Sequence, residues 1–336
     1  MQCPKCNQEA RKFGKDHHGN QRFQCLTCRK TFSDRPVNPL KEMRLSLDKA
    51  IHVLKLLTEG MSIRATVRTS GVAKATVLSL LVSVGQKCEA FLRDAISGVP
   101  ATDVQADEIW GFVRMKEKTA TKRHYNTAQG IGDAYCFVAI ERHTKLIMAW
   151  HLSRRDGPST KEFMENVKDG TRGHFQLSTD GFPGYPEAVA MTFEKSGRTV
   201  DHAAVVKEYG KFEDDHRYSP SEVLSVQTYC CSGSPDLNRA CTSHVERQNL
   251  QIRMQNRRMT RLTNAFSKKW DNHRYAMALH FATYNFVRPH GTLTKQAEGR
   301  KTTPAMRAGL VDHVWSMDEL LEKAAGYQVD GPQVPE

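Results

Sequence analysis

The spacing of apolar residues predicts a helical region followed by a region of short strands. Over residues 45–59 apolar side chains recur at helical spacing, and the pattern stops at Gly60. A short helix capped by Ser62, a turn at residues 69–72 and a third helix over about 73–95 follow. This order predicts a helix-turn-helix domain over residues 45–96, with Lys74, Thr76 and Ser79 facing a DNA major groove. A purely structural helical hairpin would show the same spacing.

From residue 104 the pattern changes to β-rich runs. Strands are predicted over residues 104–113, 134–141, 146–152 and 175–179, and helices over 158–168 and 186–195. Three strands followed by alternating helix and strand indicate a mixed α/β sheet, in a domain over residues 101–310. Residues 197–242 are less readable and are interpreted as an insertion. A basic helix over 243–261 and a core helix over 272–286 follow, and a short helix and disordered tail are expected over 311–336.

The first 36 residues carry two CxxC pairs, Cys3 with Cys6 and Cys25 with Cys28. Their spacing is typical of a zinc ribbon, in which four thiolates hold one structural zinc ion. So small a segment buries little apolar surface, so metal binding would supply much of its folding free energy. The alternative is two redox pairs or unconnected thiols.

Charge is unevenly distributed along this chain of 336 residues with a net charge of +12. Residues 1–100 hold 17 Lys and Arg against 8 Asp and Glu, and residues 243–300 hold 11 against 3, so the remainder is acidic overall. Two basic blocks around an acidic middle favour binding to a polyanion such as double-stranded DNA. A solvated basic surface is the alternative. No run of 18 apolar residues and no signal-peptide pattern occur, so we expect a cytoplasmic, nucleoid-associated protein with no membrane partner.

Three acids are candidates for metal-dependent phosphoryl chemistry. Asp107 lies inside a predicted buried strand, where an unpaired carboxylate is costly unless a metal or partner neutralises it. Asp180 ends a strand and precedes a glycine, and Glu246 is the one acid of the basic helix. Glu108 is expected to stand apart, because successive strand side chains point to opposite faces. Converging carboxylates can hold two Mg (or Mn) ions for phosphodiester cleavage.

The basic helix supplies candidate contacts to DNA. Glu246, Asn249 and Arg253 are spaced to share one helix face, so a metal-binding carboxylate and a DNA-binding cation would lie side by side. Arg247 and Arg257 are further candidates for phosphate contacts, because the helix carries almost no negative partner.

Taken in order, the motifs CPKC…CLTC, the predicted helix-turn-helix, DEIWGFV, STDGFPGY and HVERQNLQIR resemble DDE transposases of the bacterial insertion-sequence-one family. The resemblance covers about residues 1–310. It implies a ribonuclease H-like catalytic fold in which Asp107, Asp180 and Glu246 bind Mg, and Arg253 is similar to the residue that grips DNA in many such enzymes. It also implies recognition of terminal inverted repeats, end cleavage and strand transfer into target DNA, and we expect a homo-oligomer on DNA. A zinc-ribbon and helix-turn-helix regulator with an inactive catalytic domain, or a nuclease without strand transfer, are the alternatives.

Overall fold

The computed structural model describes residues 1–15, 21–33, 40, 43–127, 130–210 and 222–327. The chain forms two compact units, Met1–Arg44 and Leu45–Glu336. The end of the predicted ribbon at residue 36, the middle of the 197–242 segment and the tail after residue 327 lie outside the described residues.

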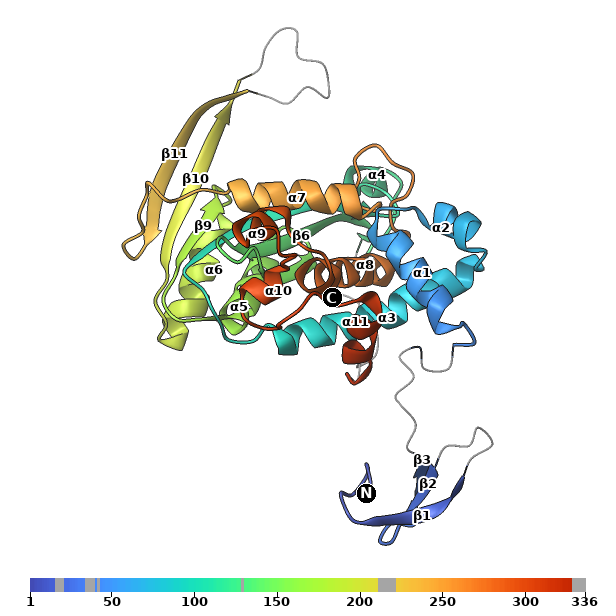
Figure 1. Ribbon diagram of the computed structural model, residues 1–336. Coiled ribbons are helices and arrows are strands. Elements are labelled where there is room, and N and C mark those ends of the chain that lie inside the picture. Colours follow the sequence, from blue (N-terminus) through green and yellow to red (C-terminus); the bar gives the residue numbers. More distant parts are fainter. Residues whose placement is uncertain (16–20, 34–39, 41–42, 128–129, 211–221, 328–336) are drawn as a thin grey trace. The chain divides into compact units, whose positions relative to one another are not determined.

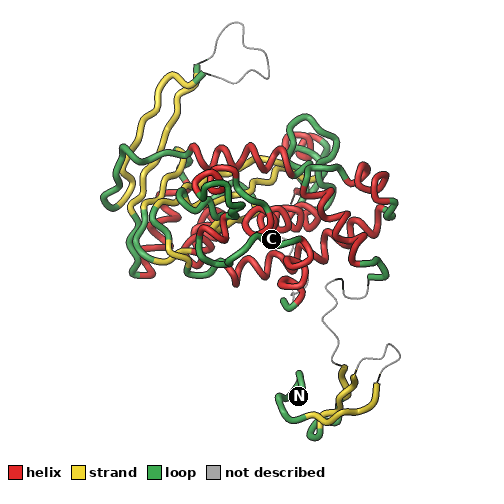
Figure 2. Tube along the Cα trace, in the orientation of Figure 1, coloured by secondary structure: helices red, strands yellow, loops and turns green. Residues whose placement is uncertain are grey.

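The smaller unit is a three-stranded antiparallel sheet, with strand order β1-β2-β3. The yellow segments next to the N-terminus in Figure 2 are these strands. Its strands are β1 (Ala10–Lys15), β2 (Gln21–Cys25) and β3 (Thr31–Ser33). Phe23 and Phe32 stack with ring centroids 5.8 Å apart. Such a small apolar core is insufficient to stabilise a unit of this size, which is the situation in which a structural metal contributes most.

The larger unit begins with three helices, α1 (Leu47–Thr58), α2 (Ile63–Ser70) and α3 (Lys74–Ala95), and they confirm the helices predicted from the sequence. Ser62 caps α2, because its hydroxyl accepts a hydrogen bond from the Ala65 N–H at 3.2 Å. Gly71 ends α2 in the left-handed conformation, with φ of +69°, which allows the chain to turn directly into α3.

A six-stranded mixed sheet forms the centre of this unit, in the order β11-β10-β9-β5-β6-β7. Four of its strands, β11, β10, β9 and β6, are labelled in Figure 1. β5 pairs in parallel with β9, and β9 with β10, whereas β6, β7 and β11 join by antiparallel pairing. The strands are β5 (Asp103–Val113), β6 (Gly132–Glu141), β7 (Ile147–Ser153), β9 (Gln176–Asp180), β10 (Asp201–Tyr209) and β11 (Val223–Ser232). The four predicted strands are therefore confirmed, with small shifts at their ends.

Helices cover both faces of the sheet, and cross-strand pairs show which face each covers. Phe137 on β6 lies opposite Glu108 and packs on Phe163 of α5 (Gly157–Gly170), with the ring centroids 5.3 Å apart. Trp150 on β7 belongs to the other face, because it lies opposite Val138, and packs on Phe281 of α8 (Trp270–Ala282) at 5.4 Å. α6 (Gly184–Phe193) covers the same face as α5, because its Tyr185 bonds Glu108. α7 (Ser243–Gln255) covers the same face as α8, because its Asn249 bonds Asp107.

The long helix α3 packs closely on α8. A Cβ atom added at Gly85 would lie 2.4 Å from the Tyr275 Cβ, so only glycine allows the two backbones to approach so closely. α3 is also the one helix of the described chain that is long and apolar enough to cross a membrane, and half of that stretch is buried inside the fold. Part of the apolar surface of α3 is therefore buried by packing against α8.

Two expectations need correction. The 197–242 segment contributes β10 and β11, and β10 pairs with β9, so this segment is partly a portion of the central sheet. The basic helix ends at Gln255, before residue 261, because buried Asn256 turns extended and its amide donates to the Ala276 carbonyl at 3.4 Å. The short helix expected over residues 311–336 is confirmed as α11 (Met317–Ala325), and a further short helix, α10 (Pro304–Arg307), precedes it.

The remaining elements are short connections. They are β4 (Val99–Pro100), α4 (Glu117–Lys122), β8 (Thr171–Arg172), the 3-10 turn η2 (Glu194–Ser196), the π-helical turn η3 (Thr283–Val287) and α9 (Gly291–Gln296). Within η3, the amide of Asn285 accepts from the Ile147 N–H at 3.0 Å and donates to the Ile147 carbonyl at 3.1 Å. These two hydrogen bonds satisfy backbone groups of β7 that have no further strand beside them, because β7 is an edge strand of the sheet.

Candidate active site

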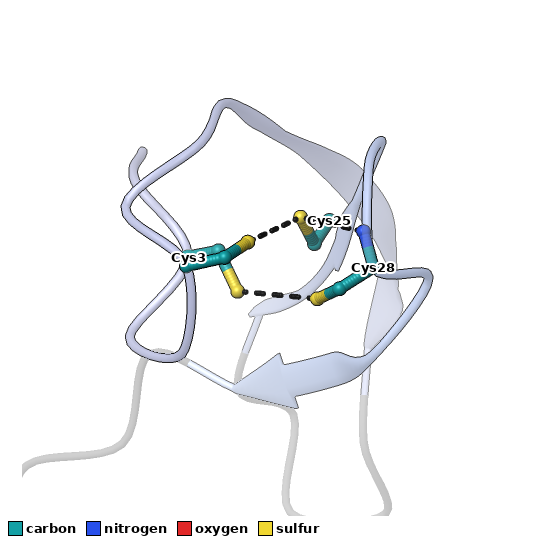
Figure 3. Close-up of side chains that lie close together, drawn as sticks. Cys3, Cys25 and Cys28 are labelled. Carbon is teal, nitrogen blue, oxygen red and sulfur yellow. Dashed lines mark hydrogen bonds between the residues drawn. The ribbon is translucent and has the colours of Figure 1, made fainter.

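The four cysteines of the small unit lie together as the sequence predicts. Their sulfur atoms all lie within 4.8 Å of one another, and the Cys6 and Cys25 sulfurs are 3.5 Å apart. The Cys3 and Cys28 sulfurs are 3.6 Å apart, and both residues are labelled in Figure 3. The backbone N–H of Cys28 points at the Cys25 sulfur at 3.4 Å and lowers the pKa of that thiol to about 6. Four sulfurs at this separation fit the tetrahedral ligand set of a structural zinc ion.

In the larger unit, acids from two adjacent strands converge. Asp107, Glu108 and Asp180 each offer a carboxylate oxygen within 4.8 Å of the others. β5 pairs with β9 from Asp103–Gln176 to Gln105–Ser178, and the same parallel register continued by two residues sets Asp180 level with Asp107. The two strands have already stopped pairing before that level, so the side chains meet beside the unpaired stretch of β5. Asp180 is the last residue of β9, and the ends of strands are where α/β sheets usually carry their functional groups.

Glu108 therefore belongs to the acid cluster, and the expectation that it stands apart is wrong. Its side chain does start on the opposite face from Asp107, as the pleat requires, but its carboxylate reaches the common edge. Arg155 forms an ion pair with it, and the Tyr185 hydroxyl donates to it at 2.8 Å. Burial and the nearby charge of Asp180 still raise the pKa of Glu108.

Arg155 and Tyr185 are the functional neighbours that sequence reasoning missed. Arg155 follows β7, contacts Asp180 at 3.8 Å and lies 4.2 Å over the Phe182 ring. Tyr185 lies within the STDGFPGY motif, so a weak signal was present for it. For Arg155 the signal was weaker still, since an Arg-Arg-Asp sequence after a strand is ordinary.

Asp107 has a different environment, with no cation bound to it in the described part of the chain. It accepts hydrogen bonds from the Asn249 amide at 2.8 Å and from the Glu108 N–H at 2.8 Å. Burial, followed by the charges of Asp180 and Glu108, raises the pKa of Asp107 to about 7. A buried carboxylate beside two other acids is destabilised as the anion, and a divalent cation with oxygen ligands would relieve this.

α7 is fixed to β5 by a buried glutamine. The side-chain oxygen of Gln105 accepts hydrogen bonds from the His244 N–H at 2.8 Å and the Val245 N–H at 3.3 Å, which are free donors in the first turn of α7. Since Gln105 and Asp107 point to the same face, this contact sets the helix so that Asn249 reaches Asp107.

Glu246, the third predicted acid, is near the cluster but not within it. It is exposed, accepts from the Thr242 hydroxyl at 2.6 Å and forms an ion pair with Lys207 of β10. It nevertheless lines the same surface groove as Asp107 and Glu108, and its charge contributes to the raised pKa of Asp107. The structure thus brings Asp107 and Asp180 together and leaves Glu246 on the wall of the groove.

We call the surface groove that Asp107, Glu108 and Glu246 line the acidic groove. Basic side chains of α7 and of the loop after it also line this groove. Arg253, Arg257 and Arg261 lie along it with Asn249, whereas Arg247 is exposed outside it. Arg253 donates to the Met259 carbonyl at 3.1 Å, and burial together with Arg261 lowers its pKa to about 10, so it remains a cation at neutral pH. A groove with acids at its floor and arginines on its wall can accept a phosphodiester and a metal ion together.

The predicted DNA-facing residues of the first helices lie at the start of α3. Lys74 and Ser79 are exposed and Thr76 is half-buried. They are accessible to a partner, as a recognition helix requires.

No protein-family model matches the chain, and a search of curated proteins found no match. The functional assignment therefore depends on the residues and geometry described above.

Proposed function

We propose that this chain is a DNA transposase that binds terminal inverted repeats and catalyses metal-dependent end cleavage and strand transfer of an insertion sequence. The observation that carries the proposal is the meeting of Asp107 and Asp180, distant in sequence, with Glu108 at one sheet edge beside an arginine-lined groove. The mixed sheet with helices on both faces and the resemblance to insertion-sequence-one transposases support a ribonuclease H-like fold.

The residues fit divalent metal because they are hard oxygen donors and because Asp107 lacks a cationic partner among the described residues. Asp107 and Asp180 would hold Mg or Mn ions, and Glu246 is the further ligand that the resemblance implies. Two such ions, when bound, stabilise the attacking and leaving oxygens of a phosphodiester. Glu246 would have to exchange Lys207 and Thr242 for the metal, which its exposure allows.

The remaining side chains would position the DNA. Asn249 holds the Asp107 carboxylate in place, and Arg155 neutralises Glu108, so the cluster does not carry three uncompensated charges. Arg253 and Arg257 would hold phosphates along the acidic groove. The cysteine site and the helices α1 to α3 would supply recognition of the repeats, with Lys74, Thr76 and Ser79 toward the bases.

The test uses labelled DNA taken from both sides of the coding sequence, incubated with the full-length zinc-loaded protein and Mg or Mn. We expect joined strands with the wild type, and a loss of about a hundredfold or more in Asp180→Asn. Glu165→Gln, which changes an exposed acid of α5 that pairs with Lys161, is the matched control and should retain activity. Free ends without joining would assign a nuclease, and bound but intact DNA under every metal would leave a DNA-binding regulator.

A further inference from the structure

A second groove adjoins the acidic groove along the free edge of β5. β5 pairs with β9 only as far as Gln105, and beyond that the loop after α7 runs beside it, with the Arg114 N–H bonded to the Ser267 carbonyl at 2.7 Å. We call this the aromatic groove, and its lining includes Trp110, Phe112, Lys116, Arg258 and Phe266. Arg253, Thr260 and Arg261 line both grooves, so the two are continuous.

Three rings line the aromatic groove without being buried in the core. Trp110 and Phe112 have centroids 5.6 Å apart, and Phe112 and Phe266 are 4.9 Å apart, each pair tilted by 37°. All three are half-buried, in contrast to core rings such as Phe137, which has 0% exposure. The Lys116 ammonium lies 5.3 Å from the Trp110 centroid, so a cation already lies over the ring.

Arg258 is a half-buried cation whose guanidinium is only partly paired within the described chain. One terminal nitrogen donates to the Ser267 hydroxyl at 2.9 Å, while the other is buried and has no hydrogen-bond partner in the described chain. No carboxylate among the described residues pairs with it. Burial lowers its pKa to about 10, so it remains charged at neutral pH. An uncompensated buried charge of this kind is costly, and an anionic ligand in the groove would offset the cost.

We propose that the aromatic groove holds an unpaired nucleotide of the DNA strand that lies at the acids, with its base against Trp110 and Phe266 and its phosphate toward Arg258 and Arg261. This rests on the proposed function only in that the strand enters from the acidic groove. Rings beside cations are the combination that binds single-stranded nucleic acid. The nucleotide must be unpaired, because the faces of a base within a duplex are covered by its stacked neighbours.

The experiment measures binding without cleavage, with the full-length zinc-loaded protein and no added Mg or Mn, by the fluorescence anisotropy of a labelled DNA hairpin. One probe has a blunt end and the other a 3′ overhang of four thymidines. We expect the wild type to bind the overhang probe about tenfold more tightly, which is the scale of stacking on one aromatic side chain. Phe266→Ala should remove this preference, and Phe266→Tyr should retain it. Tyr209→Ala, an exposed aromatic on β10 outside the groove, is the matched control and should retain it.

Equal binding of the two probes by the wild type would overturn the proposal. So would a preference that survives both Phe266→Ala and Trp110→Leu, with folding of each variant verified by circular dichroism. Because no Mg or Mn is added, these outcomes are independent of catalysis. An overhang preference in a protein that never cleaves DNA would support the nucleotide site in the aromatic groove and contradict the transposase function. Cleavage without an overhang preference would support the transposase function and contradict the nucleotide site.

Discussion

The raised pKa of Asp107 predicts how the larger unit should respond to Asp107→Asn. In the unfolded chain this carboxyl titrates near 3.8, and in the fold its pKa is about 7. At pH 5 Asp107 is therefore protonated in the folded chain and ionised in the unfolded chain. A pKa that is raised on folding stabilises the fold at low pH, and this contribution is lost as the pH rises through about 7.

The magnitude follows from the pKa values. Between pH 5 and the folded pKa of about 7, each pH unit lowers the free energy of unfolding of the wild type by about 1.36 kcal/mol. Over the range from pH 5 to pH 8 the loss is therefore about 2 to 3 kcal/mol. Asparagine does not titrate, so Asp107→Asn does not lose this contribution. We therefore expect the stability of the variant relative to wild type to increase by about that amount between pH 5 and pH 8. Replacing the carboxylate by an amide also changes the hydrogen bonds to Asn249 and the Glu108 N–H. The free-energy cost of that change is the same at both pH values, so it cancels from the difference.

Urea unfolding in EDTA, followed by tryptophan fluorescence, measures this difference. The four tryptophans, Trp110, Trp150, Trp270 and Trp315, all belong to the larger unit, so the signal excludes the cysteine unit. A change below about 0.5 kcal/mol between the two pH values would refute the reasoning, because it would mean that the Asp107 pKa is not raised on folding.

The other predictions concern the cysteine site, the helix contact and the partner of Glu108. Purified protein should contain one zinc ion per chain by atomic emission, and Cys25→Ser should lose it while the tryptophan unfolding curve stays unchanged. Gly85→Ala should destabilise the larger unit by about 1 to 3 kcal/mol, because its new methyl group meets Tyr275, and a urea midpoint equal to wild type would contradict this. Arg155→Met leaves buried Glu108 without its cation, so the pKa of Glu108 should rise further. Urea unfolding at pH 8 should then show a free energy of unfolding lower by about 1 to 3 kcal/mol, and an unchanged value would show that the ion pair does not stabilise the fold.

Local patterns in the sequence predict much of this fold. Apolar periodicity located α1 to α3, and the β-rich runs located β5, β6, β7 and β9. Asp107 and Asp180 were found by the same local reasoning, since each is an acid at a strand position where a charge needs a partner. The cysteine site was predicted from spacing alone, because zinc ribbons impose that spacing on the chain.

The remaining features depend on contacts that form only on folding. Glu108 was excluded by the pleat rule, which gives the face on which a side chain starts but not how far it reaches at an unpaired edge. Arg155 pairs with Glu108 across the sheet, 47 residues away in sequence, and local pattern gives no information on such a pair. β10 was missed although residues 203–206 form a short apolar run, because the charged residues around it resemble a loop.

Binding of Mn²⁺, measured by the loss of the free-ion signal in electron paramagnetic resonance, tests the metal site most directly. The full-length, zinc-loaded protein should bind Mn²⁺ at pH 8, and its affinity should fall as the pH drops below about 7, because a proton then competes for Asp107. Asp107→Asn and Asp180→Asn should each bind at least about tenfold more weakly, and Glu165→Gln should match wild type. Binding that is the same in all four proteins would contradict the assignment of these acids as metal ligands.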